Sequence, residues 1–227
     1  MFVPDSNFTR WLVPALACML QMAQAGRPVT PWLFEGSLDG RPGMVFLALH
    51  ERMTVAYDRE GCSVYLAWQG PAEPEAGPAP AGTGPGYQAA GPIYHKRVNP
   101  APWSLKGPKG NVPVTVRLIA AAVEGGQARL DYVLGLRGGA KIMVSERPEF
   151  DDHYGDNALF RNFEVTGIPA GMTLRLEVGG RGMAETWGGG ATGQVIREGD
   201  RYFLLQELDG ETPLKVSWSP LGSSEIK

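Results

Sequence analysis

Apolar and polar residues alternate one by one along much of this chain, as they do in a strand whose two faces meet different surroundings. The clearest example is residues 172–178, where the even-numbered positions are apolar and the odd-numbered positions are polar. Residues 53–58 and 214–218 show the same pattern, whereas residues 44–49 are apolar throughout, which is typical of a strand covered on both faces. No long window has the 3.6-residue period of an amphipathic helix. We therefore predict that the chain folds mainly as β-strands.

Turn signals separate the predicted strands, for example Glu124-Gly125-Gly126 and Arg137-Gly138-Gly139. The 31 glycines and 19 prolines fit many turns and argue against a helical protein. No segment is suited to the long crossover helix that a parallel sheet requires. The pattern predicts an all-β fold, an antiparallel β-sandwich of the jelly-roll type, with eleven short strands at 44–49, 53–58, 63–68, 114–120, 127–134, 140–145, 159–165, 172–178, 193–197, 201–207 and 214–218.

Residues 70–92 interrupt this pattern, because they are rich in Pro and Gly and contain almost no large apolar residue. Such a segment cannot supply a core. It is either a linker between two domains or a long Pro/Gly-rich loop within one sandwich. We favour the loop, because residues 30–69 hold only three predicted strands, which are few for an independent domain. The prediction is one sandwich domain over residues 26–227.

Residues 1–25 are typical of a secretory signal peptide. Arg10 supplies a positive charge, residues 11–20 form an apolar run, and Ala23-Gln24-Ala25 is a small-x-small cleavage site. A run of ten is too short to cross a bilayer, and no later segment approaches that length. We expect a secreted or periplasmic protein without a membrane span. The alternatives are an amphipathic helix or buried strand, and lipidation at Cys18.

The charge of the chain argues against one class of partner, and its cysteine count bears on disulfide formation. The chain has 21 basic and 24 acidic residues, a net charge of −3, and no Lys/Arg cluster, so we expect no nucleic-acid partner. Cleavage after Ala25 would leave Cys62 without a partner for an intrachain disulfide. We predict that Cys62 is a small buried residue. The alternative is a reactive thiol or an intermolecular disulfide.

No motif for catalysis or for a cofactor stands out. His50, His95 and His153 are not spaced as metal ligands, and the chain has no haem attachment site, so we expect no catalytic residue, metal, cofactor or haem. We expect His50 in a turn and His95 at the exposed end of a strand. The segment 149–157 is rich in acidic residues, but they lack the spacing of a calcium-binding loop. We expect a solvated loop there.

Loop aromatics are the most suggestive feature. Trp103 and Trp187 lie in predicted loops, where a tryptophan can stack on the apolar face of a sugar while acids and amides bind its hydroxyls. The alternative is that each tryptophan packs over the edge of the sandwich. The residues predicted to bind ligand are Trp103, Trp187, Asp151, Asp152 and Asn157.

These features predict a secreted, non-catalytic binding or accessory module for carbohydrate or for an exported protein partner. One alternative is a polysaccharide-active lyase or hydrolase, which needs a cleft where a base such as His95 or His153 meets Tyr or Arg. The other is a structural subunit that assembles through edge strands.

Two groups of segments carry a family resemblance. The first comprises 31–34, 38–42, 45–49, 55–58 and 62–70, and the second comprises 129–132, 142–146 and 159–163. In this order they resemble an uncharacterised extracytoplasmic β-domain that precedes haem c domains in large secreted bacterial cytochromes and sugar-dehydrogenase-like proteins. The resemblance covers most of residues 30–165. It implies export and a sandwich-like domain near carbohydrate breakdown or extracellular electron transfer, and it supplies no catalytic residues.

Overall fold

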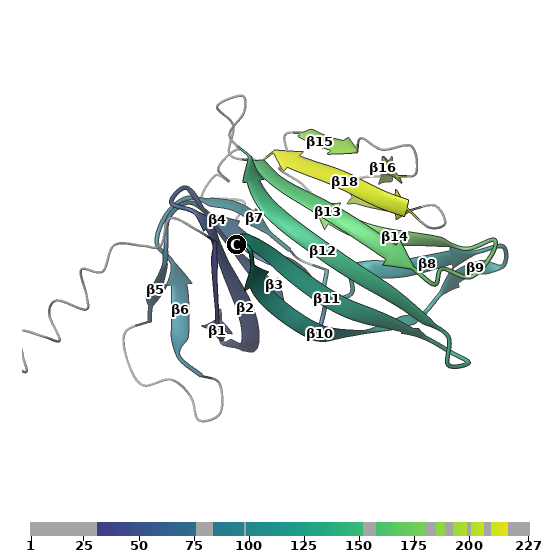
Figure 1. The fold of residues 1–227 in the computed structure, drawn as a ribbon, viewed down its shortest axis with the longest axis horizontal. Helices are drawn as coiled ribbons and strands as arrows, with labels where there is room; N and C mark the ends of the chain where they lie inside the picture. The colour runs from purple at the N-terminus through teal and green to yellow at the C-terminus, as the bar shows by residue number, and fades with distance from the viewer. Residues whose placement is uncertain are drawn as a thin grey trace, which may run out of the picture.

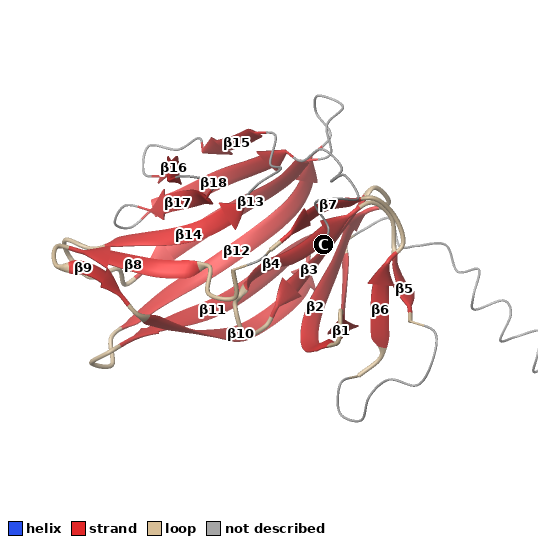
Figure 2. Ribbon diagram, turned by 180° about the vertical axis from the view of Figure 1, so that it is seen from behind, coloured by secondary structure: helices blue, strands red, loops and turns tan. Residues whose placement is uncertain are grey.

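The computed structural model describes residues 31–75, 84–97, 99–151, 158–179, 185–188, 193–198, 201–206 and 210–217, with backbone alone from residue 179 onward. Throughout these segments the chain forms strands and no helix (Figures 1 and 2). The strands are β1 (Trp32–Leu38), β2 (Arg41–His50), β3 (Met53–Asp58), β4 (Ser63–Trp68), β5 (Ala72–Pro74), β6 (Gly86–Ala89), β7 (Ile93–Lys96), β8 (Trp103–Gly107), β9 (Gly110–Val112), β10 (Val114–Glu124), β11 (Gln127–Leu136), β12 (Lys141–Asp151), β13 (Ala158–Thr166), β14 (Thr173–Gly179), β15 (Glu185–Gly188), β16 (Gly193–Glu198), β17 (Arg201–Gln206) and β18 (Gly210–Ser217).

These strands form three sheets. The orders are β5-β6-β1-β2-β3-β4-β7, β10-β11-β12-β13-β18-β15 and β16-β17-β14-β8-β9. Neighbouring strands pair antiparallel except β1 and β6, which pair in parallel through two residues. The predicted all-β, sandwich-like fold is therefore confirmed. Figure 1 shows β1–β6 at one end of the molecule and β8, β9 and β14 at the other, with β10–β13 running along it.

The seven-stranded sheet is strongly curled. Its strands β6 and β7 are joined by residues 90–92, yet they pair with β1 and β4, at opposite ends of the β1–β4 meander. In a flat sheet these two positions would be roughly 24 Å apart, whereas the link reaches at most about 14 Å. The sheet must therefore curl until its two edges approach each other. We call it the curled sheet.

The inside of the curled sheet has its own apolar cluster. It contains Leu38, Met44, Phe46, Ala56, Tyr65, Leu66 and Trp68, all nearly inaccessible to solvent. The other face of the same strands also packs against apolar residues, so β2–β4 are covered on both sides. This is the arrangement that the continuous apolar run 44–49 predicts.

Residues 70–92 depart from the prediction of one long loop outside the core. Both ends of the segment form strands, β5 and β6, and the Tyr87 ring packs 5.1 Å from the ring of Phe46 and 5.0 Å from that of Phe34. A Cβ at Gly36 would lie 2.6 Å from the Tyr87 ring, so the close approach requires glycine there. One aromatic residue is enough to bring this polar segment into contact with the core.

A larger core joins all three sheets. It gathers Val45, Leu47, Val55 and Val64 of the curled sheet, Leu130, Leu134, Ile142, Val144, Leu159 and Phe163 of the six-stranded sheet, and Leu105, Leu174 and Leu176 of the five-stranded sheet. The apolar residues of segment 172–178 face this core, as their alternation predicts. The strands of the six-stranded sheet therefore pack against the curled sheet near one of their ends and against the five-stranded sheet near the other (Figure 1).

A buried ion pair lies inside this core. Glu146 of β12 is fully buried and Arg161 of β13 is 2 % exposed. Arg161 donates through Nε to Oε1 at 2.6 Å and through Nη2 to Oε2 at 3.0 Å. The hydroxyl of Tyr57 donates to Oε1 at 2.5 Å, and that of Tyr132 to Oε2 at 2.6 Å. Four donors therefore satisfy the carboxylate and offset the cost of burying it.

This cluster connects two sheets, because Tyr57 belongs to β3 of the curled sheet and the other three residues belong to the six-stranded sheet. Burial and the negative charge of Glu146 raise the pKa of both tyrosines well above the ordinary value. Both phenols therefore keep their protons and remain donors to the carboxylate.

We expect loss of the buried ion pair to lower the free energy of unfolding far more than loss of a charge on the other face of the same strand. Glu146→Gln leaves the Arg161 guanidinium buried without a countercharge, which we expect to cost about 3 kcal/mol of unfolding free energy. Glu149→Gln is the matched control on the opposite face of the same strand and should stay within about 0.5 kcal/mol of the parent. Urea denaturation measures both. A Glu146→Gln protein as stable as the parent would contradict this role.

Candidate functional site

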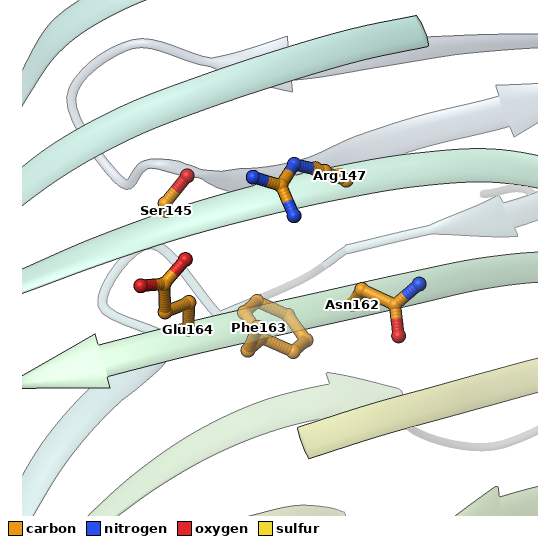
Figure 3. A pocket seen from close by; sticks show the side chains of 5 residues that line it. All are labelled: Ser145, Arg147, Asn162, Phe163 and Glu164. Carbon is orange, nitrogen blue, oxygen red and sulfur yellow. The ribbon is translucent and has the colours of Figure 1, made fainter. Parts of the chain in front are cut away.

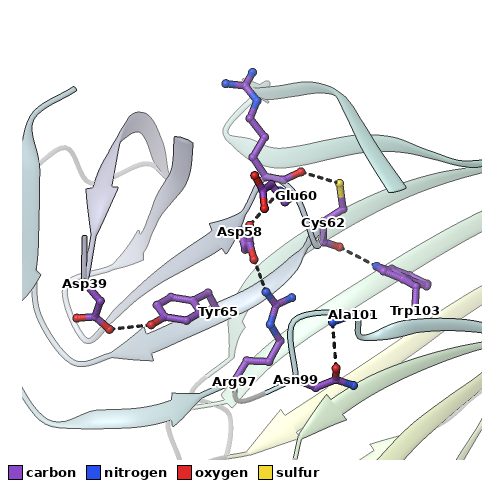
Figure 4. A network of polar contacts seen from close by, with 10 residues as sticks. Asp39, Asp58, Glu60, Cys62, Tyr65, Arg97, Asn99, Ala101 and Trp103 are labelled. Carbon is purple, nitrogen blue, oxygen red and sulfur yellow. Dashed lines mark hydrogen bonds and ion pairs between the residues drawn. The ribbon is translucent and has the colours of Figure 1, made fainter. Parts of the chain in front are cut away.

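Trp103 is not available to a ligand. It is the first residue of β8 rather than a loop residue, and it is 6 % exposed. Its indole N–H donates to the carbonyl of Cys62 at 3.0 Å (Figure 4). Its ring packs 5.5 Å from Tyr132 and 6.2 Å from Phe163. The prediction of a sugar-stacking Trp103 is therefore wrong, because the indole finds its polar partner inside the sandwich.

The other predicted ligand-binding residues fall near one sheet or outside the described chain. Trp187 lies in β15 rather than in a loop, and it pairs with Lys215 of β18. Asp151 is the last residue of β12 and pairs with Ala158. Asp152 and Asn157 lie outside the described residues.

The face of the six-stranded sheet that points away from the core, here called the outer face, brings polar side chains together. Glu146 and Arg161 point into the core, so their neighbours along β12 and β13 point outward. Arg147 pairs with Asn162, and Ser145 pairs with Glu164. Directly paired residues share a face, so these four side chains lie side by side.

These side chains line a shallow hollow of about 140 Å³, to which Phe163 also contributes. Figure 3 shows the side chains of Ser145, Arg147, Asn162 and Glu164 around it, two from β12 and two from β13. Arg147 and Glu164 are exposed, whereas Ser145 and Asn162 are half-buried. The Ser145 hydroxyl has no hydrogen-bond partner among the described residues. That hydroxyl oxygen is itself buried, so the groups that the hollow presents to solvent are the Arg147 guanidinium, the Glu164 carboxylate and the half-buried Asn162 amide.

The predicted residues Trp187 and Asp151 belong to the same sheet as this hollow, but neither lines it. Phe160 pairs with Glu149 on one side and with Lys215 on the other, and Lys215 pairs with Trp187. This row is two residues along the strands from Arg147 and Asn162. The row of Asp151 follows two residues further on. The six-stranded sheet therefore carries two of the five predicted positions: Trp187 in the row beside the hollow but two strands from β13, and Asp151 one row further on.

Sequence reasoning missed the residues of the hollow itself. Strands over 140–145 and 159–165 are predicted, but the alternation within them does not say which residues of the two strands are paired. The orientation of Glu146 is the information that would have located the site from the sequence. If Glu146 is taken as a buried residue, the neighbouring Ser145 and Arg147 must face solvent.

The histidines do not form a catalytic centre in the described chain. His50, at the end of β2, stacks on Phe150 with ring centroids 4.3 Å apart. His95, in β7, is 8 % exposed, so the prediction of an exposed His95 is wrong. Burial, with the positive charges of Arg161 and Arg97, lowers its pKa to about 3. His153 lies outside the described residues. No group of three or more potential metal ligands was found among the residues that are described.

Cys62 is buried, as predicted, and it forms no disulfide within the part of the chain that the structure describes. Burial raises the pKa of its thiol to about 12, with a further contribution from Asp58, so the thiol stays protonated. Beside it, Arg97 forms a buried ion pair with Asp58, and Tyr65 donates to Asp39 at 2.8 Å (Figure 4). These two contacts link strands and turns of the curled sheet, and burial keeps the thiol protonated.

No helix in the described segments is long and apolar enough to cross a membrane. The predicted signal peptide, residues 1–25, lies outside these segments. No protein-family model matches this chain, and no curated protein is significantly similar to it. The resemblance of residues 30–165 to a haem-associated extracytoplasmic domain therefore stays a prediction.

The low pKa of His95 predicts a pH dependence. The unfolded chain binds a proton at this residue below its ordinary pKa of 6.5, whereas the folded chain does so only near pH 3. Stability should therefore fall as the pH drops from 6.5 towards 3, by up to about 1.4 kcal/mol per pH unit from this residue.

His95→Gln removes that contribution. Its unfolding free energy should fall less steeply than that of the parent between about pH 7 and pH 5. Urea denaturation across this range compares the two slopes, so a uniform loss of stability from repacking does not affect the result. Parallel curves for variant and parent would show that His95 is not held neutral.

Proposed function

We propose that this chain is a secreted, non-catalytic binding module that recognises carbohydrate on the outer face of its six-stranded sheet. The observation that carries the proposal is the hollow lined by Ser145, Arg147, Asn162 and Glu164. A sugar presents several hydroxyls that each donate and accept hydrogen bonds. The guanidinium of Arg147, the amide of Asn162 and the carboxylate of Glu164 on one open surface match that demand.

The surroundings of the hollow also suit a polymer. Strand β12 has 11 residues and β13 has 9, so the outer face extends about 30–35 Å along the strands. A chain of several sugar units could lie along such a face without entering a closed pocket. Phe160, half-buried in the next row, offers an apolar ring edge, and the row continues through Lys215 to Trp187.

Burial argues against catalysis by His95 and the tyrosines. Tyr57, Tyr132, Arg161 and Glu146 are 0–2 % exposed and His95 is 8 % exposed. Although these residue types occur together in acid–base chemistry, a polymer cannot reach them at such exposure. They support the fold, whereas Arg147 and Glu164 of the outer face are accessible.

One observation favours a second candidate, a glycoside hydrolase. Glu164, which lines the hollow, pairs in register with Glu211 of β18. Retaining glycosidases use two carboxyl groups about 5 Å apart, and directly paired positions of two antiparallel strands have backbones about that close. Release of reducing ends from a polysaccharide panel, abolished by Glu164→Gln, would support this candidate over the binding module.

Binding is tested by retention on a panel of insoluble polysaccharides, followed by calorimetry with soluble fragments of the polymer that retains the protein. Arg147→Ala and Asn162→Ala should each weaken binding about tenfold, because each removes hydrogen bonds worth about 1–2 kcal/mol. Trp187→Ala should weaken it in the same direction by removing a stacking surface.

The matched control is Lys141→Ala, an exposed position on the same strand that pairs with Gly135, away from the hollow. It should bind like the parent. Absence of retention on every polymer, or full binding by both Arg147→Ala and Asn162→Ala, would overturn the proposal. Retention of an exported protein instead of a polysaccharide would also overturn it.

A further inference from the structure

Strand β10 is the outermost strand of the six-stranded sheet. It pairs with β11 on one side, and among the described residues no strand pairs with its other edge. It is one of the longest strands at 11 residues, and its only charged residues are Arg117 and Glu124. An apolar edge strand of this length presents a row of backbone N–H and C=O groups that can pair with another strand.

A β-bulge gives these two charges a common face. The register between β10 and β11 shifts between Leu118 and Ala120. Residues seven apart in a regular strand would lie on opposite faces. Because the bulge adds one residue, Arg117 and Glu124 both lie on the outer face, and both are exposed.

The strand is arranged symmetrically about Ala121. Arg117 pairs with Val133 of β11, and Glu124 pairs with Gln127. Leu130 lies midway between Val133 and Gln127 along β11, and it pairs with Ala121. Ala121 is therefore equally far from Arg117 and Glu124 along the sheet. A two-fold axis through Ala121 would therefore set β10 of a second copy antiparallel to the first. Arg117 of each copy would then lie opposite Glu124 of the other.

The remaining positions fit the same axis. Leu118 would lie opposite Val123 of the second copy, with both on the core side. The bulge would lie opposite Ala122. At the bulge, Ile119 is 47 % exposed, one of three exposed large apolar residues in the described part of the chain. The contact would cover Ile119.

We infer that the chain forms a symmetric dimer through antiparallel pairing of β10 with β10 of a second copy. Charge complementarity between Arg117 and Glu124 selects a second copy of this chain as the occupant of the edge. The dimer joins the two six-stranded sheets into one, and their outer faces become continuous. The inference does not depend on the proposed carbohydrate binding, although two sites on one surface would bind a polymer more tightly than one.

Charge reversal tests the pairing. Arg117→Glu places Glu against Glu in both contacts, and Glu124→Arg places Arg against Arg. Each variant alone should dimerise about tenfold more weakly than the parent in sedimentation equilibrium, because two attractions become two repulsions. An equimolar mixture of the two variants should dimerise like the parent, since every contact is then Glu against Arg. The double variant should also behave like the parent.

Lys141→Glu reverses an exposed charge of the same face away from this edge and should not change the association. The inference would be overturned if the parent were monomeric at all concentrations. It would also be overturned if Arg117→Glu and Glu124→Arg both dimerised as strongly as the parent. Circular dichroism confirms that the variants are folded.

A second measurement does not depend on charge. Ala121→Cys places two thiols on the axis, where the Cα atoms of an antiparallel pair lie about 4.5–5.5 Å apart, within the range of a disulfide. Mild oxidation should link this variant into a dimer. Thr115→Cys, at the end of the strand, should stay unlinked, as should the parent. Cys18 is replaced by Ser in every protein, so that the buried Cys62 is the one native cysteine left. Equal linkage of Ala121→Cys and Thr115→Cys would contradict a symmetric contact.

Discussion

The side chain of Glu146 sets the geometry of both faces of the six-stranded sheet. Because this carboxylate points into the core to meet Arg161, Tyr57 and Tyr132, its neighbours Ser145 and Arg147 must point to solvent. Arg161 has the same effect on β13, where Asn162 faces outward beside Arg147. A one-residue slip of either strand would bury the polar groups of the hollow and expose the ion pair. The ion pair inside therefore fixes the polar surface outside.

The same carboxylate explains how the curled sheet is held against its neighbour. Apolar contacts between Val45, Val55 and the strands β11–β13 are not directional, so they allow the sheets many relative positions. The hydrogen bond from Tyr57 to Glu146 has a direction and a length. It selects one position among them. The apolar cluster inside the curled sheet does not depend on the position of the six-stranded sheet, because it lies on the opposite face of the curled sheet.

Periodicity predicts the strands and the class of fold, since burial on one face leaves an alternating pattern in the sequence. It does not predict the register, the curl of the first sheet or the partners of polar side chains. Trp103 and His95 are examples: each stands in a polar or Pro-rich stretch, and each is buried because distant residues close over it. The hollow was missed for the same reason, because Arg147 and Asn162 meet only through the pairing of β12 with β13. Trp187 was predicted in a loop and lies instead in a strand of that same sheet.

One sheet thus combines three properties: an ion pair on its core side, a polar hollow on its outer side and, at β10, an edge that no other described strand pairs with. The central claim is that the Glu146 cluster makes the curled and six-stranded sheets a single cooperative unit. Native-state hydrogen exchange on Tyr57→Phe, which removes the hydrogen bond between the two sheets, tests it most directly. Amide protection should fall by the same factor, about tenfold, in β2–β4 and in β11–β13. A loss confined to β2–β4 would contradict the claim.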